Sequence, residues 1–163
     1  MTRMTADLIG PCGMNCALCA SYLAYASGVP KKAGQVSHCA GCRPRDKRCA
    51  FIKKRCSRLG PDGITFCYEC PEMPCPDLLR IDRLYRTKYG MSMIANLEFL
   101  KAKGMAAFLK RQKKEHACPA CGDIVCVHNG KCYACGAAAG PRTPLKPLPL
   151  PKPLDREGRA KTR

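Results

Sequence analysis

Residues 116–136 read HACPACGDIVCVHNGKCYACG and contain two repeated cysteine motifs, CPACG and CYACG. Two cysteines separated by two residues can turn their sulfurs towards one ion, whereas a disulfide between such near neighbours closes a small strained ring. The intervening segments IVCVH and KCY predict two short strands joined by a two-residue turn at Asn129–Gly130. We therefore predict a zinc-ribbon β-hairpin over residues 117–136. Its four ligands, which a rubredoxin-like iron would share, are Cys118, Cys121, Cys132 and Cys135.

The whole chain is rich in cysteine, with fifteen among 163 residues. This density is typical of either an extracellular disulfide scaffold or an intracellular metalloprotein. The start, MTRMTADLIGPCG, has no apolar run of the length that a signal peptide needs, and no window approaches 18 apolar residues. We therefore expect a cytoplasmic protein that is not inserted in a membrane, whose thiols bind metal rather than each other.

The first ten cysteines are expected to build two metal sites. One grouping joins two CxxC pairs, with Cys12 beside the site or in place of one ligand: Cys16, Cys19, Cys39 and Cys42. The other grouping takes three cysteines of the segment TFCYECPEMPCP with one from the preceding segment CAFIKKRC: Cys67, Cys70 and Cys75, with Cys49 or Cys56. Ten thiols exceed the eight that two such sites require, so the allocation stays open.

The metal in these amino-terminal sites is also open. The segment CGMNCALC has the CxxxCxxC spacing of radical SAM enzymes, but those enzymes need a βα barrel, and the sequence shows no train of alternating strands and helices. Cys75 followed by Pro76 is similar to ferredoxin runs that end in CP, whereas CAGC at Cys39 is a common zinc turn. We favour zinc, with up to three sites in the chain. The alternative is a [4Fe–4S] cluster in the amino-terminal module.

Helical patterns fill much of the remaining chain. They follow Pro11 in NCALCASYLAYAS, begin at Asp46 in DKRCAFIKKRCSRL, and follow Pro76 in DLLRIDRLYRTKYG. Two more, capped by Ser92, run to residue 116 and are split at Gly104. The fold class is thus a small, metal-stabilised, mostly α protein with irregular cysteine-rich loops. We expect a metal-binding module at 1–90, a helical connector at 91–116, the ribbon at 117–136 and a disordered tail at 137–163.

Basic residues give the chain a formal net charge of +17 at pH 7. The last predicted helix carries four of them, and the tail combines six prolines with seven Lys or Arg and only two acidic residues. These features predict contact with an unknown protein or nucleic acid through the helix and the tail. The alternative is that both are merely solvated. The four residues of the helix are Lys110, Arg111, Lys113 and Lys114.

Taken together, these motifs resemble the DUF3795 family. The resemblance rests on CGMNCALC, CAGCR, CAFIKKRC, CYECPEMPCPDL, the NLEFLKAKGMAAFLKRQ helices and CPACGDIVCVHNGKCYACG, and covers roughly residues 8–136. It implies an uncharacterised prokaryotic cysteine-rich protein that is presumed to bind metal. The tail after Gly136 lies outside it. The resemblance supplies no reaction.

The function that these observations favour is a binding or interaction module folded by zinc. Four-thiolate sites leave no open position for a substrate, and the sequence shows no nucleophile with a paired base and no phosphate-cradling glycine loop, which makes an enzyme the less favoured class. The alternative is an iron–sulfur or rubredoxin-like redox protein in electron transfer or sensing. Thiols in excess of the ligands could sense oxidants: Cys12, Cys19, Cys56 and Cys126.

Overall fold

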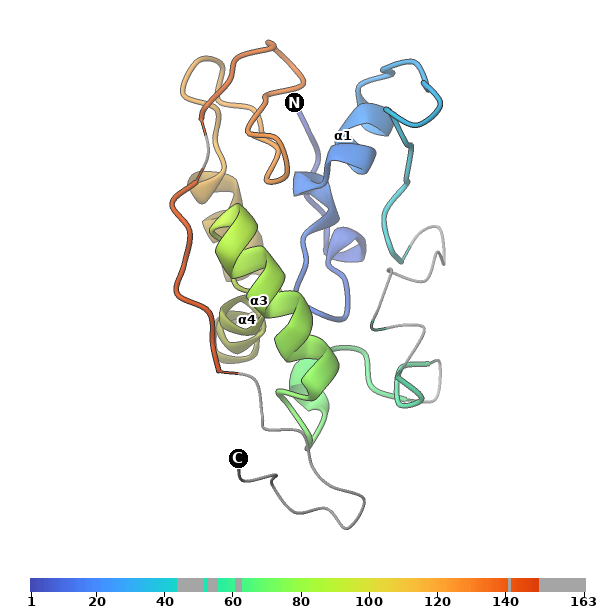
Figure 1. Ribbon diagram of the computed structural model, residues 1–163, viewed down its shortest axis with the longest axis vertical. Helices are drawn as coiled ribbons and strands as arrows, with labels where there is room; N and C mark the ends of the chain where they lie inside the picture. The colour runs from blue at the N-terminus through green and yellow to red at the C-terminus, as the bar shows by residue number, and fades with distance from the viewer. Residues whose placement is uncertain (44–51, 53–55, 61–62, 141, 150–163) are drawn as a thin grey trace, which may run out of the picture.

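Two long helices form the body of the molecule (Figure 1). The structure is a computed structural model, which describes residues 1–43, 52, 56–60, 63–140 and 142–149. The long helices are α3, Pro76–Tyr89, and α4, Met93–Glu115. The shorter elements are the helix α1, Ala20–Ala26, and three 3-10 turns. These turns are η1, Ala6–Leu8, η2, Cys16–Leu18, and η3, Cys67–Glu69.

The predicted helix signals around α3 and α4 are confirmed. Pro76 lies in the first turn of α3, where its missing N–H costs no hydrogen bond. Gly90 ends the helix in the left-handed conformation at φ 59°, which glycine adopts without strain. Ser92 caps α4 by accepting a hydrogen bond from the backbone N–H of Ala95 at 3.0 Å. Local sequence therefore determines where this helical pair turns.

A buried carboxylate joins the two helices at this turn. Asp82 of α3 is fully buried, and its Oδ1 accepts hydrogen bonds from Ser92 Oγ at 2.7 Å and from the N–H of Ile94 at 3.0 Å. Its Oδ2 accepts one from Arg86 Nε at 2.6 Å. The side chain thus satisfies a donor in the first turn of α4 and pairs with a cation of its own helix.

Gly104 interrupts α4. Its φ of 77° and ψ of 172° lie outside the helical region, in backbone space that is open to glycine. The predicted split of this segment at Gly104 is confirmed, and α4 is two helical halves joined at a kink.

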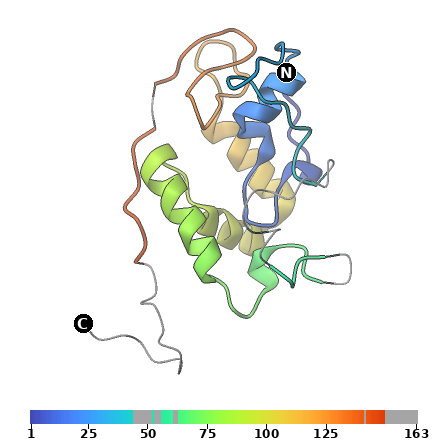
Figure 2. The same ribbon diagram turned by 45° about the vertical axis from the view of Figure 1, so that its right-hand side comes forward.

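One hydrophobic core connects the amino-terminal segment, both helices and the ribbon. Its fully buried side chains include Leu18 before α1, Leu78 of α3, Leu97 and Phe108 of α4, and Ile124 of the ribbon. Figures 1 and 2 show the amino-terminal segment beside the helices and the ribbon near their ends. The expected segments of the chain therefore pack on one another rather than standing apart.

The ribbon has no regular strand in its described residues, so the predicted β-hairpin is corrected. Single antiparallel bridges connect Ala117 with Ile124, Val125 with Cys132, and Lys131 with Ala138. Backbone groups that would extend these pairs are used in tight turns instead. The turn predicted at Asn129–Gly130 is also wider than two residues, because the N–H of Cys126 bonds to the carbonyl oxygen of Lys131 at 2.9 Å.

The first predicted helix is shorter than expected. Cys16 begins the 3-10 turn η2, and Cys19 then has extended backbone, with φ −83° and ψ 136°, before α1 begins at Ala20. The Asn15 side chain accepts the N–H of Ala17 at 3.0 Å, which favours a local turn over a continuous helix. Most of the helix predicted from Asp46 lies outside the described residues.

The described part of the tail is attached to the body. The N–H of Leu145 donates to the carbonyl oxygen of Arg86 at 2.9 Å, and Arg86 Nη1 donates to the carbonyl oxygen of Lys146 at 3.3 Å. Leu148 packs against the core. Residues 142–149 therefore lie along α3, as Figure 1 shows.

Candidate metal centre

Four cysteines of the ribbon bring their sulfurs together. Cys118 Sγ lies 3.7 Å from Cys135 Sγ, and Cys121 Sγ lies 3.6 Å from Cys132 Sγ. All four sulfurs lie within 4.8 Å of one another, and among the described residues no other group of three or more potential ligands is this compact. The structure thus gathers the four side chains that the two CxxC motifs predict as one site.

The distances fit a tetrahedral ion. Zinc–sulfur bonds of about 2.3 Å at tetrahedral angles place the sulfurs about 3.8 Å apart, close to the 3.6 and 3.7 Å observed here. A disulfide would require about 2.0 Å. Zinc is a suitable ion for four thiolates, and iron of the rubredoxin type uses the same donor set. The donors therefore fit a metal of this class without selecting between zinc and iron.

Two matching turns hold the ligands. The N–H of Gly122 donates to the carbonyl oxygen of Cys118 at 2.8 Å, and the N–H of Gly136 donates to that of Cys132 at 2.9 Å. Both glycines have positive φ, 74° and 77°, which the tight reversal after each cysteine pair requires. The glycine of each CxxCG motif thus determines the direction of its sulfur pair.

The electrostatics of the site call for a cation. Burial opposes ionisation of Cys118, but the N–H groups of Ala120 and Cys121 point at its sulfur and lower its pKa to about 7. The N–H of Asp123 favours the thiolate of Cys121, yet the neighbouring sulfurs, Cys135 foremost, raise its pKa to about 12. Four thiolates would repel one another at these distances, and a divalent metal would supply the compensating positive charge.

A third turn of the same kind lies between the two cysteine pairs. In CVHNG the N–H of Gly130 donates to the carbonyl oxygen of Cys126 at 2.9 Å, and Gly130 has a φ of 67°. The N–H groups of His128 and Asn129 reach the Cys126 sulfur as those of Ala120 and Cys121 reach Cys118. Asn129 occupies the place of the second cysteine. The repeat CPACG, CVHNG and CYACG is visible in the sequence, but the CxxC spacing on which the prediction rests does not detect its middle member.

The third turn attaches the ribbon to the start of α1. The N–H of Val127 donates to the carbonyl oxygen of Leu18 at 3.0 Å, and the N–H of Ala20 donates to Nδ1 of His128 at 3.2 Å. Because Nδ1 accepts, the neutral ring carries its proton on Nε2, which lies 2.9 Å from Tyr85 Oη. This turn therefore connects the ribbon to both α1 and α3.

The amino-terminal cysteines gather only in part as grouped from the sequence. Cys16 Sγ lies 3.3 Å from Cys42 Sγ, and the sulfurs of Cys12 and Cys42 both face Gly10, 3.8 and 3.9 Å from where a Cβ there would lie. Cys19 lies instead near both Cys16 and Cys126, whose charges, after burial, help raise its pKa. Cys39 is joined to α1 through its N–H and the carbonyl oxygen of Ser21, 3.1 Å apart.

A further group of thiols surrounds the buried Cys67. Burial first, and then the proximity of three other cysteines, raises its pKa to about 12. The three neighbours are Cys75, Cys56 and Cys70. The structure thus places Cys56 with the cysteines of the TFCYECPEMPCP segment, while Cys49 lies outside the described residues. The ligand role of these residues stays a prediction.

The comparisons with known proteins identify a family for part of the chain. Residues 8–80 match a family described as "Protein of unknown function (DUF3795)". The resemblance is thereby confirmed over these residues, whereas α4 and the ribbon lie beyond the match. No curated protein and no solved structure is significantly similar to the chain. Within the described residues, every helix is too short or too polar to cross a lipid bilayer.

Proposed function

Given a chain whose residues 8–80 match DUF3795, a family of unknown function, we propose that this protein is a zinc-folded binding module. The observation that carries the proposal is the ribbon group, in which four sulfurs are spaced as the corners of a tetrahedral site: Cys118, Cys121, Cys132 and Cys135. Four protein ligands complete the coordination of zinc and leave no position for a substrate or a reactive water. The metal is therefore structural, and the surface that it holds in place performs the function.

Metal content tests the first part of this proposal. Cys118→Ser is expected to lower the zinc content by one ion per chain, measured by elemental analysis after purification under reducing conditions. Cys126→Ala is the matched control, because this buried cysteine occupies the same kind of turn without joining the four-sulfur group. Equal zinc content in Cys118→Ser and the parent protein would overturn the ribbon site, and zinc loss in the control would overturn the ligand assignment.

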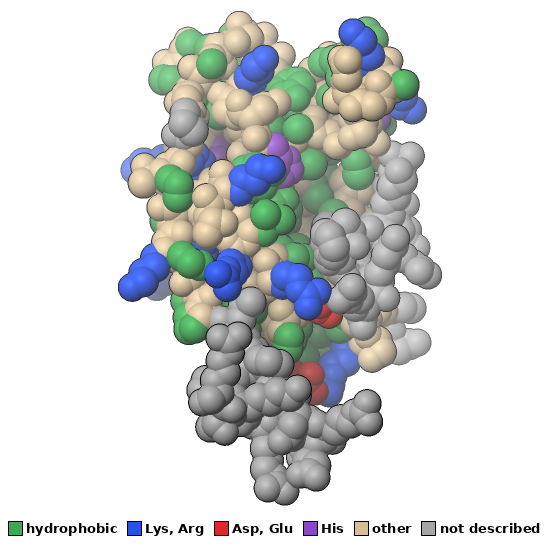
Figure 3. Space-filling model, in the orientation of Figure 1, with side chains coloured by type: hydrophobic (Ala, Val, Ile, Leu, Met, Phe, Trp, Pro, Cys, Tyr) green, Lys and Arg blue, Asp and Glu red, His purple; other side chains and the backbone are tan. Residues whose placement is uncertain are grey.

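The second half of α4 supplies the proposed binding surface. Three lysines there are exposed, and Glu115 is the acidic residue nearest to them in sequence. Arg111 is not part of this surface, since its guanidinium lies over the Phe99 ring at 4.2 Å and donates to Asn96 Oδ1 at 3.0 Å. On the face in Figure 3, basic side chains are spread widely and acidic ones are few. The three lysines are Lys110, Lys113 and Lys114.

A nucleic acid is the partner that we propose for these charges. Each phosphate contact made by a lysine releases a counterion, so affinity falls as salt rises. Replacing Lys113 and Lys114 by glutamine is expected to reduce the slope of log K against log salt by about 1.4 to 1.8, since each contact contributes about 0.7 to 0.9. The matched control replaces Lys101 and Lys103, two exposed lysines in the first half of the same helix.

A mixed pool of single- and double-stranded oligonucleotides, titrated by fluorescence anisotropy at several salt concentrations, gives the measurement. Absence of binding at about 50 mM salt, or binding that salt does not weaken, would contradict the proposal. Equal slopes for the two double variants would assign the affinity to overall charge rather than to the second half of α4.

A redox protein is the second candidate, and the thiol group around Cys67 favours it. A cubane iron–sulfur cluster takes four cysteines, and Cys67 has three other cysteines as electrostatic neighbours. Protein purified without oxygen would then be brown, would absorb near 400 nm, and would contain iron and sulfide. Colourless protein with zinc alone would exclude this candidate.

A further inference from the structure

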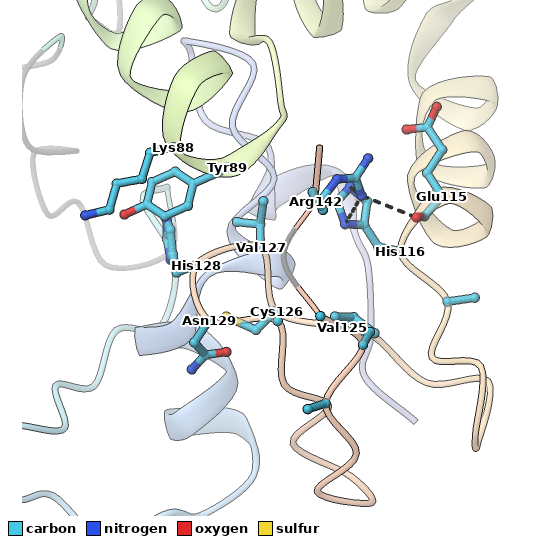
Figure 4. A pocket seen from close by; sticks show the side chains of 15 residues that line it. Lys88, Tyr89, Glu115, His116, Val125, Cys126, Val127, His128, Asn129 and Arg142 are labelled. Atoms are coloured by element: carbon cyan, nitrogen blue, oxygen red, sulfur yellow. Dashed lines mark hydrogen bonds between the residues drawn. The ribbon is translucent and has the colours of Figure 1, made fainter. Parts of the chain in front are cut away.

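A pocket of about 430 Å³ lies where the two long helices end and the ribbon begins. Its walls come from the last residues of α3, the end of α4, the third turn of the ribbon and the first part of the tail. Figure 4 shows Lys88, Tyr89 and His128 on one side of it, and His116 and Arg142 on the other. The volume lies within the range of about 300 to 1,000 Å³ that is usual for small-molecule sites.

The charge of this pocket is positive. Its lining contains two cationic side chains, Lys88 and Arg142, and one acidic side chain, Glu115. The carboxylate of Glu115 is already engaged, with Oε1 3.3 Å from Arg111 Nε and Oε2 3.4 Å from Gln112 Nε2. Among the described residues, no carboxylate pairs with either lining cation. An anion is therefore the ligand that this lining attracts.

The carboxyl ends of two helices repel an anion, but their negative charge is smaller than the positive charge of Lys88 and Arg142. Helices α3 and α4 both end at the pocket, and each carboxyl end carries about half a negative charge, which falls off within a turn. The two lining cations bring two full positive charges. In addition, Arg142 Nη1 lies 3.4 Å from the carbonyl oxygen of Glu115 and so satisfies one of the exposed acceptors of α4. The balance remains in favour of an anion.

Arg142 uses only one nitrogen of its guanidinium, Nη1, in its hydrogen bonds with the described residues. Its Nη1 lies 3.1 and 3.3 Å from the two ring nitrogens of His116, which is 3% exposed. A neutral imidazole has one unprotonated ring nitrogen, which can accept a hydrogen bond from the guanidinium. Among the described residues, Nε and Nη2 of Arg142 have no hydrogen-bond partner. These two groups form the planar fork that binds a carboxylate or phosphate in bidentate fashion.

Apolar and aromatic side chains form much of the remaining wall, beside His128 and the polar Asn129. Val125 and Val127 line the pocket from the ribbon, Ala138 and Ala139 from the tail, and Tyr89 from α3. Inorganic phosphate alone would leave these surfaces in water, whereas a ligand with a hydrocarbon or aromatic part would bury them. The pocket therefore combines a specific anion donor with a surface for an apolar group.

We propose that this pocket binds a small organic anion whose carboxylate or phosphate pairs with Arg142 and whose apolar part packs against Tyr89 and the two valines. Lys88 increases the local concentration of such anions from the opposite side. The proposal does not depend on the nucleic-acid partner, because the pocket is formed by other residues. It adds a small-molecule site to the nucleic-acid surface proposed above, whose lysines do not line the pocket.

Phenyl phosphate and benzoate are the probes for a phosphate and a carboxylate, with inorganic phosphate and phenol as the two half-ligands. The assay titrates each into the full, metal-loaded chain and follows backbone amide signals by two-dimensional NMR. Phenyl phosphate, benzoate or both are expected to cause saturable shifts at Val125, Val127 and Ala138. The probe that does so should bind more tightly than inorganic phosphate or phenol alone. The stronger of the two identifies the anion class. Absence of saturable shifts up to about 10 mM would overturn the proposal.

Arg142→Gln is expected to weaken binding at least about tenfold, because a hydrogen-bonded charge is lost. Arg83→Gln is the matched control, an exposed arginine of α3 that does not line the pocket. Unchanged amide spectra away from the pocket confirm that the variants fold. Equal affinity of the parent protein and Arg142→Gln, or shifts spread over the whole surface, would refute the assignment.

Discussion

Replacement of Asp82 by alanine is expected to destabilise the fold more than any change to a surface ion pair. Its carboxylate is fully buried and accepts three hydrogen bonds, from Arg86, Ser92 and Ile94. Arg86 is only 17% exposed at its side chain, so loss of the carboxylate leaves a largely buried charge without its acidic partner. Breaking such a pair costs about 3 to 5 kcal/mol, a fifth or more of the stability of a typical domain of about 5 to 15 kcal/mol.

Asp82→Asn separates the charge from the hydrogen bonds. The amide oxygen can still accept from Ser92 and Ile94, but the amide nitrogen then faces the guanidinium of Arg86. Because two hydrogen bonds remain, Asp82→Asn is expected to cost less than Asp82→Ala, but at least the charge-assisted bond to Arg86, about 1.5 to 3 kcal/mol. Comparing the two variants separates the two contributions of Asp82 to the free energy of unfolding. One is its ion pair with Arg86 of α3, and the other is its hydrogen bonds to Ser92 and Ile94 at the start of α4.

Urea unfolding followed by helical circular dichroism measures these free energies, with zinc buffered at one concentration throughout. Glu72→Ala is the control, because its ion pair with Arg58 is 49% and 63% exposed at the two side chains and is worth about 0 to 1 kcal/mol. A loss below about 1 kcal/mol for Asp82→Ala, or one equal to that of the control, would refute the buried-network argument.

Two further predictions concern glycine and histidine. Gly13→Ala is expected to lower the free energy of unfolding by about 2 to 5 kcal/mol, because φ is 84° and the new Cβ would lie 2.8 Å from the Met93 carbonyl oxygen. Gly104→Ala is the comparison, since φ is also positive there but no atom lies within 4 Å of the new Cβ. It should lower the free energy of unfolding by only about 1 to 3 kcal/mol. Urea unfolding checks the order, and equal costs would contradict it. Burial, and then Lys88, lower the pKa of His128 from 6.5 in the folded protein. As pH decreases, the unfolded state therefore binds a proton at this histidine before the folded state does. Stability should fall between about pH 7 and pH 5, by up to about 1.4 kcal/mol per pH unit. His128→Gln should reduce that slope, and an unchanged slope would exclude the histidine as its source.

Features that depend on neighbouring residues could be predicted from the sequence. The start of α3 at Pro76, the cap at Ser92 and the break at Gly104 each follow from the conformational preference of one residue. The four-sulfur group of the ribbon is of the same kind, since both of its pairs follow from spacing within five residues. These are the parts of the fold and the site that are confirmed.

Features that depend on distant partners could not be predicted in the same way. The break at Cys19 has a distant partner besides the local bond of Asn15, since His128 accepts the N–H of Ala20 across 108 residues of sequence. The pocket is another example, since Lys88 and Arg142 come from separate segments and neither motif nor periodicity connects them. The segments IVCVH and KCY on either side of Asn129–Gly130 predict strands, but the tight turns use the backbone groups that longer strands would need.

The contacts of the third ribbon turn with Leu18 and Ala20 have a consequence for synthesis of the chain. At about 5 to 20 residues per second, the ribosome needs roughly 5 to 20 s to add the 108 residues that separate Ala20 from His128. During this interval Cys19 has been made, but the turn that brings Cys126 beside it has not. The nascent chain therefore meets metal, or an oxidant, before the ribbon packs against Cys19.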